Sequence, residues 1–324
     1  MVKRLWPAEG IHHDLAPSTY FAPQPEGKEN WIVSKSMLWD FSKNPSRWLE
    51  SPPKTITDSM RWGSLIDCIT LTPDRFASSY ALQPENYVSK PEGDIILTTA
   101  FEGEWNSRTK VCRDWKAEQE AAGRIVMTPD QLAEASKEKL WNWNSSTCQA
   151  WREALPRHVE IVDSYTLAEA EKAMRKLSAR PEVFEMIQGA RTQVAMRFDF
   201  PDQLHGVKGI NVPAKGLIDV VPSLTGKWGS HLVDLKTTAK LDDLDQIEKT
   251  IFNFGYHGQA ALYLDMWNAL TGQDREGFVF IFQLSVAPYE VAVVELDPSA
   301  IVAGREWYLK AITKWAETVS SGKW

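Results

Sequence analysis

Two strand-like stretches of the sequence each carry one aspartate among apolar residues. "GLIDVV" covers 216–221, and "HLVDLKTT" covers 231–238, where Lys236 follows Asp234 by two residues. A buried charge is costly unless it is paired or bound to a metal. Because side chains alternate along a strand, Asp234 and Lys236 share one face. The pattern therefore predicts a sheet that carries a cluster of charges on one side.

The segment "PSLTGKWGS" (222–230) separates the two stretches and predicts a hairpin turn. In an antiparallel hairpin with its tip at 226–227, Asp219 lies directly opposite Asp234. Opposed side chains have Cβ atoms about 4.5–5.5 Å apart and point to the same face. Two carboxylates and the Lys236 ammonium then converge, unless a bulge shifts the register.

Two facing carboxylates repel each other unless something neutralises them. Mg²⁺ binds oxygen ligands and takes one or two carboxylates beside water, and Mn²⁺ is a plausible substitute. The backbone carbonyl of Leu235 is a further candidate ligand. A lysine beside such an ion can stabilise a phosphate or orient attacking water. A plain salt bridge on a sheet face is the alternative for Asp234 and Lys236.

The stretch 256–272 predicts a helix that ends at Gly272. Gln259 and Tyr263 lie one turn apart on the face that also carries the apolar residues at 266–267. Their polar groups suit contacts with a phosphate or with the carboxylates. A polar edge on a packed helix face is the alternative interpretation.

The remaining pattern predicts an α/β protein with a central mixed β-sheet flanked by helices and a helical N-terminal half. We expect a flexible arm over 1–30 and a single domain over 31–324. The expected helices cover 34–50 (ending near 44–45), 59–71, 113–123, 128–144, 166–179, 181–189 and 298–320, and residues 84–112 look irregular. The expected strands cover 192–200, 214–223, 230–238, 277–285 and 289–296.

Composition narrows the class of protein. The 324 residues carry a net charge of −7, which argues against a basic coat for nucleic acid but leaves a local basic groove open. No apolar run has the length of a membrane span, and the start lacks the apolar centre of a secretory signal. The three scattered cysteines suit reduced thiols in a cytoplasmic protein; they are Cys68, Cys112 and Cys148. The tryptophan-rich segment 141–151 fits packing, with base stacking as the alternative.

The motifs "GLIDVV", "LVDLKTT" and "GQAALYLD" resemble the PD-(D/E)XK nuclease superfamily, in its RecB-like branch with a Q-x-x-x-Y helix. The segments "SKSMLWDFSKNPSRW" and "WGSLIDCITLTPDRF" are similar to the N-terminal segments of exodeoxyribonuclease VIII-type enzymes of phages and bacteria. The likeness covers roughly 34–315. It implies a restriction-endonuclease-like fold.

The resemblance assigns roles to named positions. It implies that Asp219 and Asp234 bind the metal and that Lys236 is the catalytic lysine. It implies that Gln259 and Tyr263 organise the site and contact the DNA backbone.

Two positions depart from the family pattern. Asp67 stands where relatives have a metal-binding histidine, and its carboxylate remains a candidate Mg²⁺ ligand. Gln193 stands where relatives often have an acidic residue, and an amide is the weaker ligand. Three scattered cysteines also fall short of the four that hold an iron–sulfur cluster in some relatives, so we expect no cluster.

The resemblance implies a Mg²⁺-dependent exonuclease that degrades linear double-stranded DNA from 5′ to 3′. The product would be a 3′ single strand for recombination. The expected partners are DNA ends and a single-strand annealing protein, and a ring-shaped homo-oligomer is implied, with no membrane. The alternatives are a DNA-end-binding or assembly protein with weakened catalysis and an endonuclease of the same superfamily.

Basic residues near the predicted site are candidates for a DNA groove. Ordinary solvated charges are the alternative interpretation. These residues are Arg191, Arg197, Lys208, Lys215, Lys227 and Lys240.

Overall fold

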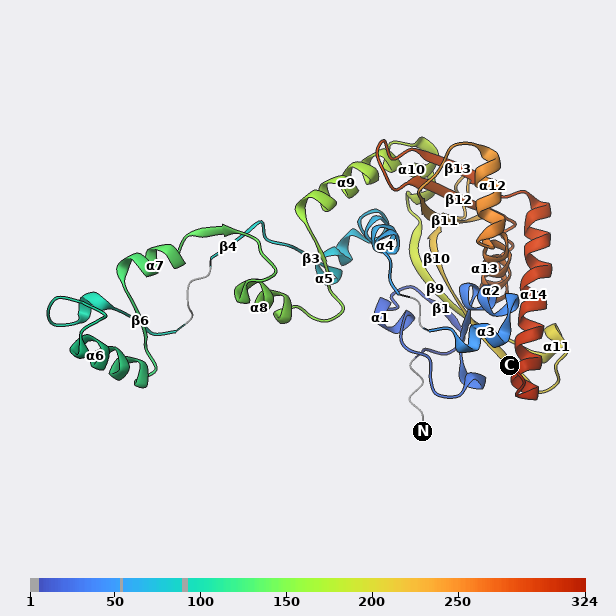
Figure 1. The fold of residues 1–324 in the computed structure, drawn as a ribbon. Helices are drawn as coiled ribbons and strands as arrows, with labels where there is room; N and C mark the ends of the chain where they lie inside the picture. The colour runs from blue at the N-terminus through green and yellow to red at the C-terminus, as the bar shows by residue number, and fades with distance from the viewer. Residues whose placement is uncertain (1–5, 53–54, 89–92) are drawn as a thin grey trace. The chain divides into compact units, whose positions relative to one another are not determined.

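The computed structural model describes residues 6–52, 55–88 and 93–324 (Figure 1). Its contacts divide the chain into two compact units, Met1–Phe76 with Ala168–Trp324, and Ala77–Leu167. The predicted single domain over 31–324 stays a prediction, because compactness alone does not show which parts fold independently.

The first unit is built around a mixed sheet, which has seven strands among the described residues. The order is β1-β9-β10-β11-β12-β13, and β2 pairs with β10. β11 and β12 are parallel, as are β2 and β10, and the other pairs are antiparallel. This confirms the predicted α/β class with a central mixed sheet. The strands are β1 (Gly10–His12), β2 (Val33–Ser34), β9 (Arg191–Phe200), β10 (Val212–Val221), β11 (His231–Thr238), β12 (Gly277–Leu284) and β13 (Val291–Glu295).

Helices flank the sheet on both sides. α13 (Tyr256–Thr271) and α14 (Pro298–Ser321) pack on one face, and α4 (Asp58–Leu71) contacts β10 and β11 from the other (Figure 1). Parallel strands need a long crossover, and α12 (Leu244–Asn253) with α13 supplies it between β11 and β12. The other helical elements of this part are α1 (Pro17–Tyr20), η1 (Lys28–Asn30), α2 (Lys35–Lys43), α3 (Pro45–Glu50), η2 (Pro73–Arg75), α10 (Pro181–Ile187) and α11 (Asp202–His205). In sequence, α5 (Phe76–Ser79) and α9 (Ser164–Ser178) each include a boundary between the two units.

The main core lies between the sheet and α2, α13 and α14. Its largest buried side chains include Phe41, Phe280, Trp267 and Trp315. α13 is buried along most of its length because it packs against both the sheet and α14, with which it shares many contacts. The predicted apolar face of this helix is confirmed, and its ends match the predicted range.

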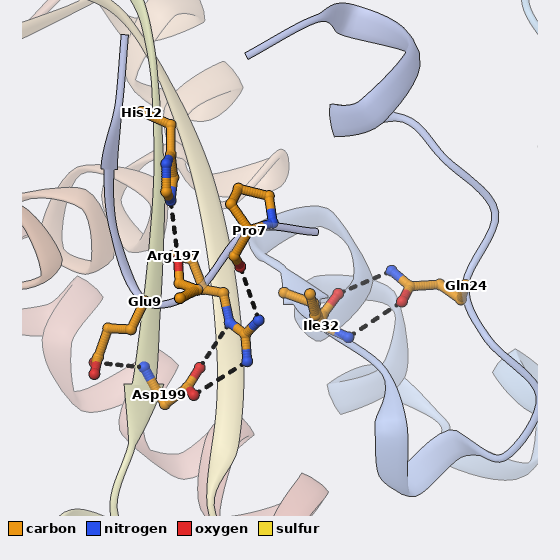
Figure 2. Close-up of polar contacts among 8 residues, drawn as sticks. Pro7, Glu9, His12, Gln24, Ile32, Arg197 and Asp199 are labelled. Carbon is orange, nitrogen blue, oxygen red and sulfur yellow. Dashed lines mark hydrogen bonds and ion pairs between the residues drawn. The ribbon is translucent and has the colours of Figure 1, made fainter. Parts of the chain in front are cut away.

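The N-terminal segment is bound to the sheet (Figure 2). β1 pairs with β9, and the Arg197 guanidinium donates to the Asp199 carboxylate and to the Pro7 carbonyl. Glu9 accepts a hydrogen bond from the Asp199 backbone N–H. These contacts hold the described part of the N-terminal segment on β9. The predicted flexibility of residues 1–30 stays a prediction.

The second unit is formed by short elements. These are β3 (Tyr80–Leu82), β4 (Asn86–Val88), β5 (Ile95–Leu97), η3 (Thr98–Ala100), α6 (Lys110–Ala121), β6 (Ile125–Met127), α7 (Pro129–Ala135), β7 (Glu138–Leu140), α8 (Ser146–Ala154) and β8 (Glu160–Val162). The helix predicted over 128–144 is wrong beyond Ala135, because the following residues pair as β7 with β4. Pairing with a distant segment overrides local helical propensity here.

The tryptophan-rich segment packs upon itself. The ring of Trp141 makes edge contacts with Trp143, Trp151 and Tyr87 at centroid distances of 5.2, 5.1 and 6.4 Å. These contacts favour the packing interpretation over the stacking one.

None of the helices within the described ranges has the length and apolar character to cross a membrane.

Candidate active site

The two aspartates predicted to face each other do so across the β10–β11 hairpin. Val220 pairs with Val233 in antiparallel register, so the adjacent position places Asp219 opposite Asp234. This is the register predicted from the sequence. Both carboxylates are buried, with residue exposures of 8% for Asp219 and 2% for Asp234.

Asp234 is held by two side chains. Its Oδ1 accepts a hydrogen bond of 2.5 Å from Gln259 Nε2 on α13. Its Oδ2 forms an ion pair with the ammonium of Lys236, two residues along the strand. A carboxylate oxygen has two lone pairs, so Oδ2 can accept from Lys236 and still accept a second partner. This oxygen therefore keeps acceptor capacity for a cation.

Asp219 bridges the two strands beside it. Its Oδ2 accepts from the Leu235 backbone N–H at 2.8 Å, and its Oδ1 accepts from Gln193 Nε2 at 3.0 Å. Gln193 has a φ of 50°, in the left-handed region that side chains rarely adopt. The Gln193 amide therefore contacts the predicted metal ligand directly.

Asp67 belongs to the same electrostatic cluster from the α4 side. α4 approaches β11 closely, since a Cβ on Gly63 would lie 3.1 Å from Thr237 Oγ1. Burial, opposed by the charge of Lys236 and reinforced by that of Asp234, raises the pKa of Asp67 to about 7. The structure thus brings the sequence-predicted aspartate of α4 toward the pair on the sheet.

The charges of the cluster shift one another's protonation. Burial and then the charges of Asp234 and Asp67 raise the pKa of Asp219 well above its ordinary value. Burial lowers the pKa of Lys236, but the carboxylates of Asp234 and Asp219 outweigh it and raise the pKa above its ordinary value. Lys236 is therefore an ammonium at neutral pH, paired with the Asp234 carboxylate.

Tyr263 follows Gln259 by one turn of α13, and its predicted contact with the DNA backbone stays a prediction. Its hydroxyl accepts from the Leu217 backbone N–H at 3.4 Å, rather than reaching a carboxylate. Burial, followed by the Asp234 charge, raises its pKa above the ordinary value, so it remains a neutral phenol. Of the predicted Gln–Tyr pair on α13, Gln259 contacts the Asp234 carboxylate and Tyr263 contacts the backbone of β10.

Sequence reasoning missed Tyr256 and Lys35. The Lys236 ammonium lies 5.0 Å from the ring centroid of Tyr256, at the first position of α13. Helical spacing could have identified this tyrosine, because it precedes Gln259 by three residues on the same face. Lys35 carries no such signal, since it is distant in sequence.

The predicted basic groove residues divide into two groups. Arg197 and Lys215 are buried and bound to protein groups, the latter to the Tyr20 carbonyl, so their predicted DNA contacts have no support in the structure. The other four are exposed, although Lys227 has Glu185 as a partner at 3.7 Å and Arg191 contacts His13. They are Arg191, Lys208, Lys227 and Lys240.

The donor set fits a Mg²⁺ ion bound through few protein ligands. Among the residues that the structure describes, no group of three or more His, Cys, Asp or Glu side chains is placed to hold a metal. Mg²⁺ usually takes only one or two carboxylates and keeps several waters. The opposed carboxylates of Asp219 and Asp234, with acceptor capacity left on Asp234 Oδ2, meet that smaller requirement.

Comparison with known proteins bears on the fold. No protein-family model and no curated protein matches the sequence. The chain is similar to a solved structure described as a "putative exonuclease" from Eubacterium rectale, with a TM-score of 0.52, 13% identity, and coverage of 96% of this chain and 88% of that one. A phage-related exonuclease from Haemophilus somnus 129PT also matches, with a TM-score of 0.27, 11% identity, and coverage of 47% of this chain and 73% of that one. At these identities the first likeness shows a shared fold, and the second is too weak for an argument.

Proposed function

We propose that the chain is a metal-dependent deoxyribonuclease. The observation that carries the proposal is the pair of buried carboxylates opposed across β10 and β11, with the Lys236 ammonium bound to one of them. A structural salt bridge requires only one carboxylate, and a second buried one adds repulsion. A bound cation would neutralise the two carboxylates, and the Lys236 ammonium would be free to contact a phosphate group of the substrate. The fold shared with a chain described as a "putative exonuclease" agrees with the proposal.

Asp219 and Asp234 would hold the ion, with the Leu235 carbonyl and Asp67 as further candidates. When bound, Mg²⁺ supplies Lewis-acid stabilisation of charge on phosphate oxygens. Gln259 orients the Asp234 carboxylate through its amide N–H. This contact keeps the lone pairs of Asp234 turned toward the site.

The protonation of Lys236 defines its role. Because the carboxylates keep its amine protonated, Lys236 cannot remove a proton from water at neutral pH. It can donate hydrogen bonds to a phosphate oxygen and so stabilise the negative charge that builds up as the phosphodiester is attacked. It can also orient the attacking water. The proton released by that water must therefore go to another acceptor.

The finer assignment rests on the family resemblance of the motifs. It is an exonuclease that degrades linear double-stranded DNA from 5′ to 3′ and leaves a 3′ single strand for recombination. The same resemblance implies that the chain forms a homo-oligomer and that a single-strand annealing protein is its partner. DNA ends, rather than internal sites, are the substrate.

Substrate topology tests this assignment. The purified chain is incubated with Mg²⁺, or Mn²⁺, and with linear duplex DNA carrying a label at either the 5′ or the 3′ end, beside a covalently closed circle. Early release of the 5′ label with an intact circle is expected, and an Asp219→Asn variant should be inactive. Cleavage of the circle would indicate an endonuclease instead. If neither DNA is cleaved with Mg²⁺ or with Mn²⁺, the nuclease proposal is refuted.

A DNA-end-binding protein with weakened catalysis is the second candidate. The contact between the Gln193 amide and Asp219 favours it, because that amide occupies one oxygen of a proposed metal ligand. Tight binding to duplex ends without cleavage, together with no Mg²⁺ binding by calorimetry, would support this candidate.

A further inference from the structure

A second buried lysine lies close to the candidate active site. Lys35 is the first residue of α2, and it is only 8% exposed. Its ammonium contacts the backbone carbonyl of Phe254 in the turn between α12 and α13. Burial, then the charge of Lys236, lowers its pKa to about 7. Burying this cation therefore opposes folding. A lysine at such a position suggests a function other than stabilising the fold.

The two lysines share one aromatic ring. The ammonium groups of Lys35 and Lys236 lie 5.1 and 5.0 Å from the ring centroid of Tyr256. A cation is attracted to the electron-rich face of a tyrosine ring. Each lysine is also repelled by the other. Lys35 therefore restricts the positions that Lys236 can occupy around the ring.

α2 also fixes the turn that starts α13. Gly255 has a φ of 65°, and a Cβ there would lie 2.3 Å from Trp39 Cε3, so the indole packs directly on the turn. The ring of Trp39 also makes an edge contact with His257 at 6.1 Å. With the bond from Lys35 to the Phe254 carbonyl, these contacts hold the first turn of α13. Gln259 reaches Asp234 from that turn.

We propose that Lys35 is a positioning residue of the candidate active site. It holds the turn before α13 and the ring of Tyr256, and thereby sets the place of Lys236 beside its carboxylate. The inference rests on the proposed function for its catalytic consequence, whereas the positioning itself is a property of the folded chain.

The chain provides a matched control. Lys43 lies on the same helix and its ammonium lies 4.7 Å from the Trp39 ring centroid, but it is exposed. Lys35→Met keeps the length of the side chain and removes its charge. Lys43→Met makes the same change on the outer side of Trp39.

The experiment compares both variants with the wild-type chain in three measurements. These are kcat and KM on linear duplex DNA with Mg²⁺, the thermal midpoint without metal, and the NMR signal of the Lys236 ε-methylene in ¹³C-lysine-labelled protein. Lys35→Met should lower kcat about tenfold, as supporting residues around a metal site do, with KM within about twofold. Its thermal midpoint should not fall, and the Lys236 signal should move as its place over the Tyr256 ring changes. Lys43→Met should leave kcat and the Lys236 signal as in the wild type.

The outcomes separate the two proposals. A cleaving enzyme whose kcat is unchanged by Lys35→Met, or a Lys236 signal that stays in place, overturns the positioning role. A lowered thermal midpoint without a kcat change also overturns it, because it describes a purely structural lysine. If the wild-type chain does not cleave DNA, the nuclease proposal fails, and the Lys236 signal alone decides the positioning role.

Discussion

The Asp219 carboxylate accepts a hydrogen bond of 2.8 Å from the backbone N–H of Leu235, across the β10–β11 hairpin. One side chain thus joins the two strands at the point where the proposed metal ligands face each other. The contact makes Asp219 a structural residue as well as a candidate ligand, and the two roles can be separated by substitution.

Asp219→Asn keeps an oxygen acceptor for Leu235, whereas Asp219→Ala leaves that buried N–H unpaired. An unsatisfied buried donor costs about 1–3 kcal/mol. The alanine variant should therefore unfold at lower denaturant concentration than the asparagine variant by about that free energy, in metal-free buffer. Equal stability of the two variants would contradict the bridging role.

Mg²⁺ should stabilise the folded chain by binding it in preference to the unfolded chain. At an Mg²⁺ concentration of about ten times Kd the gain is about 1.4 kcal/mol, which raises the thermal midpoint by a few degrees. Asp234→Asn should abolish the increase, and removal of the ion with a chelator should reverse it in the wild type. If the thermal midpoint of the wild-type chain does not change with Mg²⁺, the two carboxylates do not bind the ion.

Gln259→Leu should reduce catalysis more than stability. The variant removes the amide donor from Asp234 Oδ1 but keeps an apolar side chain of similar size. Loss of an orienting contact to a metal ligand typically costs 10- to 100-fold in activity or metal affinity. Initial rates over a range of Mg²⁺ concentrations measure both effects, with Gln246→Leu on α12 as a control. Wild-type rates in Gln259→Leu would show that the contact has no catalytic role.

Asp67 should make stability depend on pH in the absence of metal. Its pKa rises from 3.8 to about 7 on folding, so the folded chain retains a proton that the unfolded chain releases in this window. Stability from this group is fully present below about pH 4 and is lost as the pH rises through about 7. A rise of about three pKa units corresponds to about 4 kcal/mol at most, so Asp67→Asn should gain up to about that much relative to the wild type between pH 4 and pH 8. Chemical denaturation at the two pH values measures the difference, and a constant difference would contradict the raised pKa.

The sheet and the aspartate pair could be predicted because local patterns determine them. Alternation marked β9, β10, β11 and the hairpin of β12 with β13, and the spacing of 219 and 234 about the turn gave the register that is observed. The capped start of α2 at Ser34 and the end of α13 at Gly272 also follow from local residue chemistry.

Other features depend on contacts that sequence patterns do not encode. The burial of Arg197 and Lys215 follows from the N-terminal segment packing on β9 and β10, so two exposed-looking charges became internal. β7 forms only because β4 is available to pair with it. Lys35 reaches Tyr256 across more than two hundred residues of sequence, through the packing of α2 on the start of α13.

The initial rate of linear duplex DNA degradation by Lys236→Ala tests the central claim most directly. Lys310→Ala is the control, because Lys310 is an exposed lysine on α14 with no assigned role in the site. With Mg²⁺, the account predicts that Lys236→Ala loses at least about 10²-fold in rate, as the loss of one donor to the developing charge does, while Lys310→Ala stays within a few-fold of the wild type. Equal rates for Lys236→Ala and the wild-type chain would contradict the account.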